Sequence, residues 1–201
     1  MSETTGGTRG QSGLEMGSVQ RVSSNATLAF GVALEVIFII SLLILMESGT
    51  YDTWGALLIG PVLVLVSLPI LARQAERERD RSLFWLLVAA LLVKLAGAIV
   101  FHFVAYDLYD RVADAGGYHE SGVKLAEQFR AGNYDTGLDP ITGINFIRVI
   151  TGILYTIIGP SRLGGFLVFS WLGFWGLYLF YRAFTLAVPE GRARSYARLI
   201  F

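Results

Sequence analysis

The first half of the chain alternates long hydrophobic runs with short polar connections. The runs cover 28–46, 54–72 and 83–105. Each is long enough for a helix to cross a bilayer, because about 20 residues at ~1.5 Å per residue span the ~30 Å hydrocarbon core. Unpaired backbone groups cannot face lipid, so a helix is the expected form. The pattern therefore predicts three membrane-spanning helices in this half.

The hydrophobic pattern after residue 140 permits two topologies. A stripe of polar and small residues repeats at helical spacing within 141–158: Asn145, Arg148, Gly152 and Tyr155. The run 165–183 is strongly apolar and aromatic, and an arginine cluster follows: Arg182, Arg192, Arg194 and Arg198. If both segments cross, this cluster lies outside the cell. If 141–158 lies at the interface as an amphipathic helix, the cluster lies inside, as basic residues usually do. We therefore predict four spans, at 28–46, 54–72, 83–105 and 165–183.

The basic residues of the connections predict the orientation. Four arginines separate the second run from the third, whereas 47–53 contains no basic residue: Arg73, Arg77, Arg79 and Arg81. Short loops rich in Lys and Arg stay in the cytoplasm. We therefore expect a cytoplasmic N-terminus and an external segment at 106–164, in the plasma (inner) membrane of the cell envelope.

The composition is also that of an integral membrane protein. Only 16% of the residues are charged and 54% are hydrophobic, whereas soluble domains carry about 25% charged residues. The fold class is an all-α polytopic membrane protein whose external loop carries amphipathic interfacial helices. Formal net charge is zero, which argues against a nucleic-acid partner, and the absence of cysteine excludes disulfides and thiolate metal sites.

The chain divides into three regions by composition. Residues 1–25 are rich in Gly, Ser and Thr and are predicted to be a disordered cytoplasmic tail. Residues 26–82 form an N-terminal transmembrane hairpin, and 83–201 form the core around the external loop 106–164. The last residues begin another apolar segment, so we expect the core to be incomplete at its C-terminus.

The external loop is the long polar segment of the chain. Seven acidic residues lie in 106–139: Asp107, Asp110, Asp114, Glu120, Glu127, Asp135 and Asp139. Within it, 117–131 has one apolar face at helical spacing: Tyr118, Gly122, Leu125 and Phe129. This pattern predicts an amphipathic helix on the membrane or on a partner helix, with the polar residues pointing elsewhere: His119, Glu120, Lys124, Glu127 and Arg130.

Some polar residues can carry chemistry, and each also has a structural interpretation. A carboxylate at Asp114 can act as a general base toward a hydroxyl group, or favour the helix N-terminus beside it. An interfacial Arg148 can bind a phosphate bidentately, or reach lipid headgroups. Glu35 and Lys94 lie within predicted spans, where they can pair with each other. His119 lacks zinc-ligand spacing, which argues against a zinc site.

The order of these elements resembles the GT-C superfamily of membrane glycosyltransferases. The match is Asp114-Ala-Gly-Gly-Tyr118, which opens an amphipathic helix after a membrane helix, followed by an interfacial segment, a Gly-Pro-Ser break at 159–161 and a long span. It covers 83–201. The resemblance implies a polyprenyl-phosphate-linked sugar donor, used on the non-cytoplasmic side.

The resemblance also implies site residues. Asp114 takes the catalytic position and Tyr118 is its motif partner. From their chemistry and their place in the loop, Asp110, His119 and Glu120 are further candidates for substrate contacts, and Arg148 is a candidate for the donor phosphate. Many members bind a divalent cation such as Mg²⁺ or Mn²⁺. In this chain Ala115 stands where many have an acidic residue, so the cofactor is left open.

Three functions are compatible with the pattern. In the first, a glycosyltransferase moves a sugar from a lipid-linked donor to an acceptor, with Asp114 as the general base. In the second, the chain is a non-catalytic membrane scaffold or assembly subunit whose acidic loop binds a partner protein or membrane subunit. In the third, a transporter or channel component uses Lys94 and Glu35.

Overall fold

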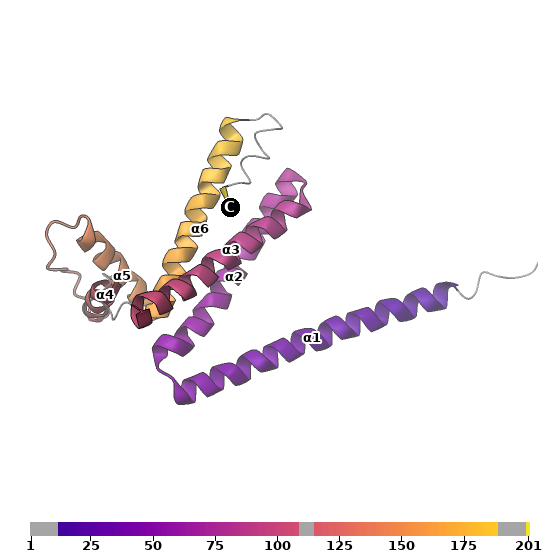
Figure 1. Cartoon of the computed structure of the whole chain (residues 1–201), viewed down its shortest axis with the longest axis horizontal. Helices are drawn as coiled ribbons and strands as arrows, with labels where there is room; N and C mark the ends of the chain where they lie inside the picture. The colour runs from indigo at the N-terminus through magenta and orange to yellow at the C-terminus, as the bar shows by residue number, and fades with distance from the viewer. Residues whose placement is uncertain (1–11, 109–114, 189–199) are drawn as a thin grey trace, which may run out of the picture. The chain divides into compact units, whose positions relative to one another are not determined.

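The described part of the chain is all-helical. The computed structural model describes residues 12–108, 115–188 and 200–201 (Figure 1). Within these residues four helical segments are long and apolar enough to cross a membrane: Ala29–Ser48, Tyr51–Glu78, Arg81–Tyr106 and Arg162–Ala187. They coincide with the four predicted spans, which confirms the all-α polytopic membrane fold.

The chain forms two compact units, which divide between Ser48 and Gly49. The first unit contains α1 (Ser12–Ser48), whose large apolar side chains are exposed, among them Phe30 and Leu43. This is the surface expected of a helix surrounded by lipid. The helix begins at Ser12, ahead of the apolar run and within the stretch expected to be a tail.

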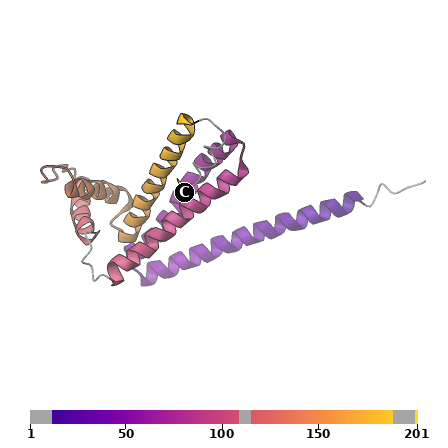
Figure 2. The same cartoon turned by 45° about the horizontal axis from the view of Figure 1, so that its top comes forward.

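The second unit is built on three long helices: α2 (Tyr51–Glu78), α3 (Arg81–Phe103) and α6 (Arg162–Ala187). They lie side by side in both views (Figures 1 and 2). Leucines of α3 recur every four residues and are buried: Leu83, Leu87, Leu91 and Leu95. This spacing gives one buried stripe, which packs with Phe174, Tyr178 and Tyr181 of α6.

Hydrogen bonds at both ends show how these helices run. At one end Ser161 Oγ, which precedes α6, donates to the Asp52 carbonyl at 3.0 Å. At the other end Tyr181 Oη donates to the Glu78 carboxylate at 2.8 Å. Because the starts of α2 and α6 lie together and their ends lie together, these two helices run parallel to each other. α3 runs in the opposite direction and packs against both.

α3 therefore ends, and α6 begins, at the same face of the three-helix unit. The segment between them starts and finishes at that face. A short π-helix, η1 (Val104–Leu108), continues α3, and its Tyr106 ring lies 6.2 Å from Phe166 near the start of α6. α5 (Ile144–Ile158) has 15 residues and does not cross, since a crossing would put the start of α6 at the opposite face. The alternative in which 141–158 spans is wrong for this structure.

α4 (Ala115–Arg130) and α5 pack closely as a pair. A Cβ added at Gly122 would lie 2.5 Å from Thr151 Cγ2, and one at Gly152 would lie 2.6 Å from Leu125 Cβ. Both glycines are thus needed for the close approach. The predicted apolar face of 117–131 does form a helix surface, and its partner is α5.

Two polar residues of α4 also contact α5, contrary to the prediction that they point elsewhere. His119 Nδ1 lies 2.9 Å from Tyr155 Oη. Arg130 donates to the Thr156 carbonyl at 3.1 Å, near the end of α5. The last carbonyls of a helix lack partners within the helix, and Arg130 satisfies one of them. The contact surface is therefore wider than the apolar stripe alone.

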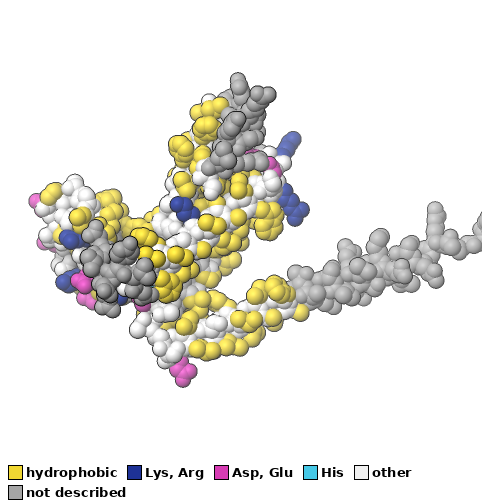
Figure 3. Space-filling view, in the orientation of Figure 1, with side chains coloured by type: hydrophobic (Ala, Val, Ile, Leu, Met, Phe, Trp, Pro, Cys, Tyr) yellow, Lys and Arg dark blue, Asp and Glu magenta, His cyan; other side chains and the backbone are white. Residues whose placement is uncertain are grey.

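Charged side chains are unevenly placed on the molecule. Figure 3 shows mostly hydrophobic side chains along the visible sides of the long helices, with a basic one midway along them, while charged side chains gather around α4 and at the connection between α2 and α3. This distribution is that of a membrane protein with a polar segment at one face.

Candidate functional site

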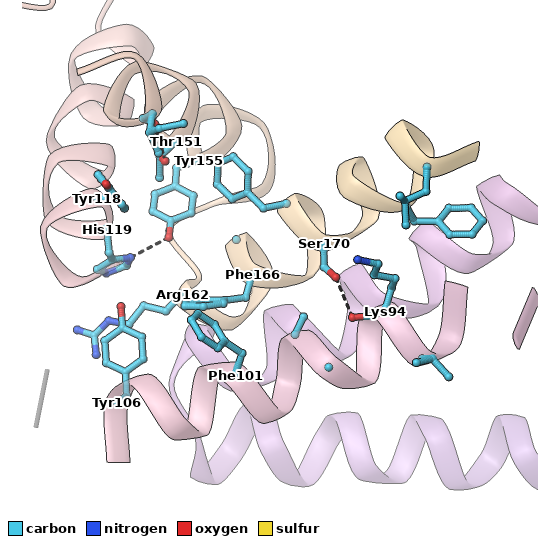
Figure 4. Close-up of a pocket in the computed structure, with 18 of the residues that line it drawn as sticks. Lys94, Phe101, Tyr106, Tyr118, His119, Thr151, Tyr155, Arg162, Phe166 and Ser170 are labelled. Atoms are coloured by element: carbon cyan, nitrogen blue, oxygen red, sulfur yellow. Dashed lines mark hydrogen bonds between the residues drawn. The ribbon is translucent and has the colours of Figure 1, made fainter. Parts of the chain in front are cut away.

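A cavity of about 720 Å³ lies among α3, η1, α4, α5 and α6 (Figure 4). Its walls along α3 and α6 are mostly apolar or small, among them Gly97, Phe101, Phe166 and Phe169, and Lys94 of α3 also lines them. Its end at the α4–α5 pair is polar: Tyr106, Tyr118, His119, Tyr155 and Arg162. The cavity thus has a long, mostly apolar part and a polar end at the α4–α5 pair.

His119 and Tyr155 form the centre of the polar end. Tyr155 is only 2% exposed, and its hydroxyl lies 2.9 Å from His119 Nδ1. Burial raises the pKa of the Tyr155 phenol, so the hydroxyl keeps its proton. Burial, and then the positive charge of Arg162, lower the pKa of His119 below its ordinary value of 6.5. His119 is therefore neutral at physiological pH.

Arg162 provides the positive charge of the polar end. Its guanidinium carbon lies 5.3 Å from the centre of the Tyr106 ring, a cation–π contact that orients the group. In Figure 4 His119, Tyr106 and Arg162 gather at the same end of the cavity. A planar guanidinium there can donate two parallel hydrogen bonds to a phosphate or carboxylate.

The first residues of α2 hold the start of α6 in place. The Asp52 carboxylate accepts hydrogen bonds from the backbone N–H of Arg162 and, at 3.2 Å, of Leu163. Ser161 Oγ caps the same turn by accepting from the Gly164 N–H at 2.9 Å. Asp52 therefore fixes the backbone from which Arg162 reaches the cavity.

Tyr51 holds the turn between α5 and α6. Its hydroxyl donates to the Ile158 carbonyl, and its ring lies against Gly159. Gly159 has φ 84°, a conformation that favours glycine, and a Cβ there would lie 2.6 Å from the Tyr51 ring. The end of α5 is thus fixed relative to α6, which keeps Tyr155 beside Arg162.

The structure brings together only some of the predicted site residues. Tyr118 and His119 line the cavity, whereas Glu120 is exposed and does not. Asp110 and Asp114 lie outside the described residues. Arg148 does not line the cavity. Its Nη1 donates to Asn145 at 3.3 Å, and its buried Nε makes no hydrogen bond among the described residues.

Sequence reasoning missed Arg162 and assigned no role to Tyr155. Arg162 had a detectable signal: it opens an apolar helix directly after the Ser161 cap, where the helix dipole disfavours a positive charge. A positive charge at that position is therefore better explained by a role in binding than by helix stability. The contact of Asp52 with it had no local signal, because the two residues are far apart in the sequence.

A metal ion is not supported by the described side chains. Across 12–108, 115–188 and 200–201 no three His, Asp or Glu residues lie close enough to hold one. Asp110 and Asp114 lie outside the described residues, and we derive no step through a metal.

The chain matches no protein-family model, no curated protein and no solved structure. The resemblance to the GT-C superfamily thus rests on the residues quoted for it.

Proposed function

We propose that the chain is a membrane glycosyltransferase, or part of one. It moves a sugar from a polyprenyl-phosphate donor to an acceptor hydroxyl at the non-cytoplasmic face. The observation that carries this proposal is the division of the cavity into a long, mostly apolar part and a polar end that contains Arg162. A lipid phosphate has the same division.

The apolar part suits a lipid chain. Lys94 and Tyr106 both line the cavity and lie 12 positions apart, which is about 18 Å along a helix. Between them the walls are aromatic or small, and the rings of Phe101 and Phe166 are tilted toward each other with their centroids 5.7 Å apart. A volume of about 720 Å³ is in the range of small-molecule sites. An isoprenoid chain can lie along this wall.

The polar end suits the phosphate. We assign the donor phosphate to Arg162, which lines the cavity, instead of Arg148, which does not. The Tyr106 ring orients the guanidinium in advance, and this reduces the ordering cost of binding. Arg162 would also stabilise the negative charge that grows on the phosphate as it leaves.

Asp114 is the proposed general base. Tyr118, four positions after it, and Tyr106, before it, both line the polar end. In the reaction the acceptor oxygen attacks the anomeric carbon while the Asp114 carboxylate takes the hydroxyl proton. The bond from that carbon to the phosphate oxygen breaks, and the lipid phosphate leaves with the electron pair.

The orientation is part of the proposal. The polar end lies at the face where α2 and α6 begin, opposite the arginine cluster at the end of α2. The positive-inside rule puts that cluster in the cytoplasm. The cavity therefore opens toward the external face of the plasma membrane.

The test is Asp114→Asn in the full-length protein in native membranes, with a radiolabelled polyprenyl-phosphate sugar. Removing a general base should lower the transfer rate about 10²–10⁴-fold. Asp135→Asn is the matched control, because Asp135 is exposed and bonded only to its own loop among the described residues. Sugar transfer at the wild-type rate by Asp114→Asn would contradict the assignment of Asp114 as the general base and favour the non-catalytic scaffold.

A further inference from the structure

The two ring nitrogens of His119 have different surroundings. Nδ1 lies 2.9 Å from the Tyr155 hydroxyl. Nε2 makes no hydrogen bond to any described residue, and the ring lines the cavity. A neutral imidazole carries one N–H donor and one acceptor nitrogen, and the partner of one nitrogen decides the role of the other.

The environment of Tyr155 identifies the donor in this contact. Its hydroxyl is buried, and His119 is its one hydrogen-bond partner among the described residues. If Nδ1 carried the proton, the buried phenolic O–H would have no acceptor there, which is costly. If the phenol donates to Nδ1, both groups are satisfied and the imidazole proton lies on Nε2.

We infer that Tyr155 holds His119 in its Nε2–H tautomer, and that this N–H and the Arg162 guanidinium together bind an oxyanion at the polar end of the cavity. Tyr155 is thus a positioning residue that acts through His119. The inference deepens the proposed function and rests on it for the identity of the anion as the phosphate of the lipid donor.

The electrostatics of the polar end agree with a neutral histidine beside a cation. Burial and then the Arg162 charge lower the pKa of His119, while Asp52 from α2 and Glu120 from α4 act in the opposite direction. Two adjacent cations would repel each other, whereas a neutral N–H adds a donor without weakening Arg162. Uncharged Tyr155 from α5 is the remaining titratable neighbour in contact with the ring.

The tautomer can be measured directly in the intact protein. The chain has two histidines, His102 and His119, so ¹⁵N-histidine labelling in detergent micelles gives two ring systems, and His119→Gln assigns them. At about pH 7.5, above the ordinary histidine pKa, His119 should show a protonated Nε2 and a bare Nδ1. A proton on Nδ1, or on both nitrogens, of the wild-type His119 ring would overturn the inference.

Binding tests the role of the tautomer. The probe is dodecyl phosphate, titrated against the purified full-length protein. Tyr155→Phe removes the donor to Nδ1, lets the tautomers mix and should weaken binding about tenfold. Tyr178→Phe is the matched control: Tyr178 is also buried, but its hydroxyl bonds to Gln74 away from the cavity. Equal binding by Tyr155→Phe and the control would contradict the positioning role.

A double-mutant cycle separates positioning from folding. In His119→Gln the amide can offer an N–H near the place of Nε2 and needs no tautomer partner. Tyr155→Phe should then weaken dodecyl phosphate binding less than twofold in this background. The same tenfold loss in both backgrounds would show that Tyr155 acts through the fold instead, and would overturn the inference.

Two further arms identify the anion and separate this inference from the proposed function. Dodecyl phosphate should bind at least tenfold more tightly than inorganic phosphate, because Phe101 and Phe166 add apolar contact. Equal affinity for dodecyl phosphate and inorganic phosphate would show that the site binds free phosphate, and would contradict a lipid ligand. Absence of dodecyl phosphate binding would overturn the oxyanion site. Binding with the expected tautomer in a chain that transfers no sugar would refute only the glycosyltransferase.

Discussion

Asp52 joins the start of α2 to the start of α6, and replacing it with alanine should loosen both the fold and the polar end of the cavity. Its carboxylate accepts from the backbone N–H groups of Arg162 and Leu163. Alanine leaves these two donors without their acceptor in a partly buried turn. At about 1–2 kcal/mol for each donor, the expected loss of unfolding free energy is about 2–4 kcal/mol. Asparagine keeps an acceptor oxygen, so Asp52→Asn should cost only about 1 kcal/mol.

The measurement is unfolding in a fixed detergent, followed by tryptophan fluorescence. Asp80→Ala is the matched control, because Asp80 caps α3 by accepting from the Ser82 N–H at 2.8 Å, away from the cavity. Loss of such a cap costs about 1 kcal/mol. Dodecyl phosphate binding should weaken in Asp52→Ala and stay unchanged in Asp80→Ala. Equal destabilisation by the two alanine variants would refute the role of Asp52 in holding α6.

Two further results are expected. Gly152→Ala should destabilise the α4–α5 pair by about 1–3 kcal/mol, because its Cβ would lie 2.6 Å from Leu125 Cβ. Gly117→Ala is the control: it lies on the open side of α4 and should be neutral or slightly stabilising. Equal thermal unfolding midpoints for the two variants would contradict the close packing. Acidification should destabilise the wild type more than His119→Gln: since the pKa of His119 is lowered in the folded state, the unfolded chain binds more protons, so this stability is complete above about pH 6.5 and falls as pH decreases. Parallel pH profiles of the two proteins in thermal unfolding would contradict a buried neutral His119.

The sequence was sufficient to predict the membrane fold, since long apolar runs leave a helix as the main solution. It also predicted α4, because Tyr118, Gly122, Leu125 and Phe129 repeat at helical spacing. The topology of α5 needed more information. Its length and polar stripe allowed two positions, and the contacts of Ser161 with Asp52 decided between them.

The candidate site was predicted only in part. Tyr118, which closes the motif that begins at Asp114, and the adjacent His119 were among the candidates, and both line the cavity. Arg148 was considered for the donor phosphate and Arg162 was not, because local spacing does not show which arginine lines a cavity. That depends on how α6 packs against α2 and α5, which is set by contacts between residues distant in the sequence.

A structure of the chain with a bound isoprenoid phosphate tests the central claim most directly. The phosphate should lie within hydrogen-bond distance of the Arg162 guanidinium and His119 Nε2, with the isoprenoid chain along Phe101 and Phe166 toward Lys94. A phosphate bound at Arg148, or a lipid chain that lies outside the cavity, would contradict the account.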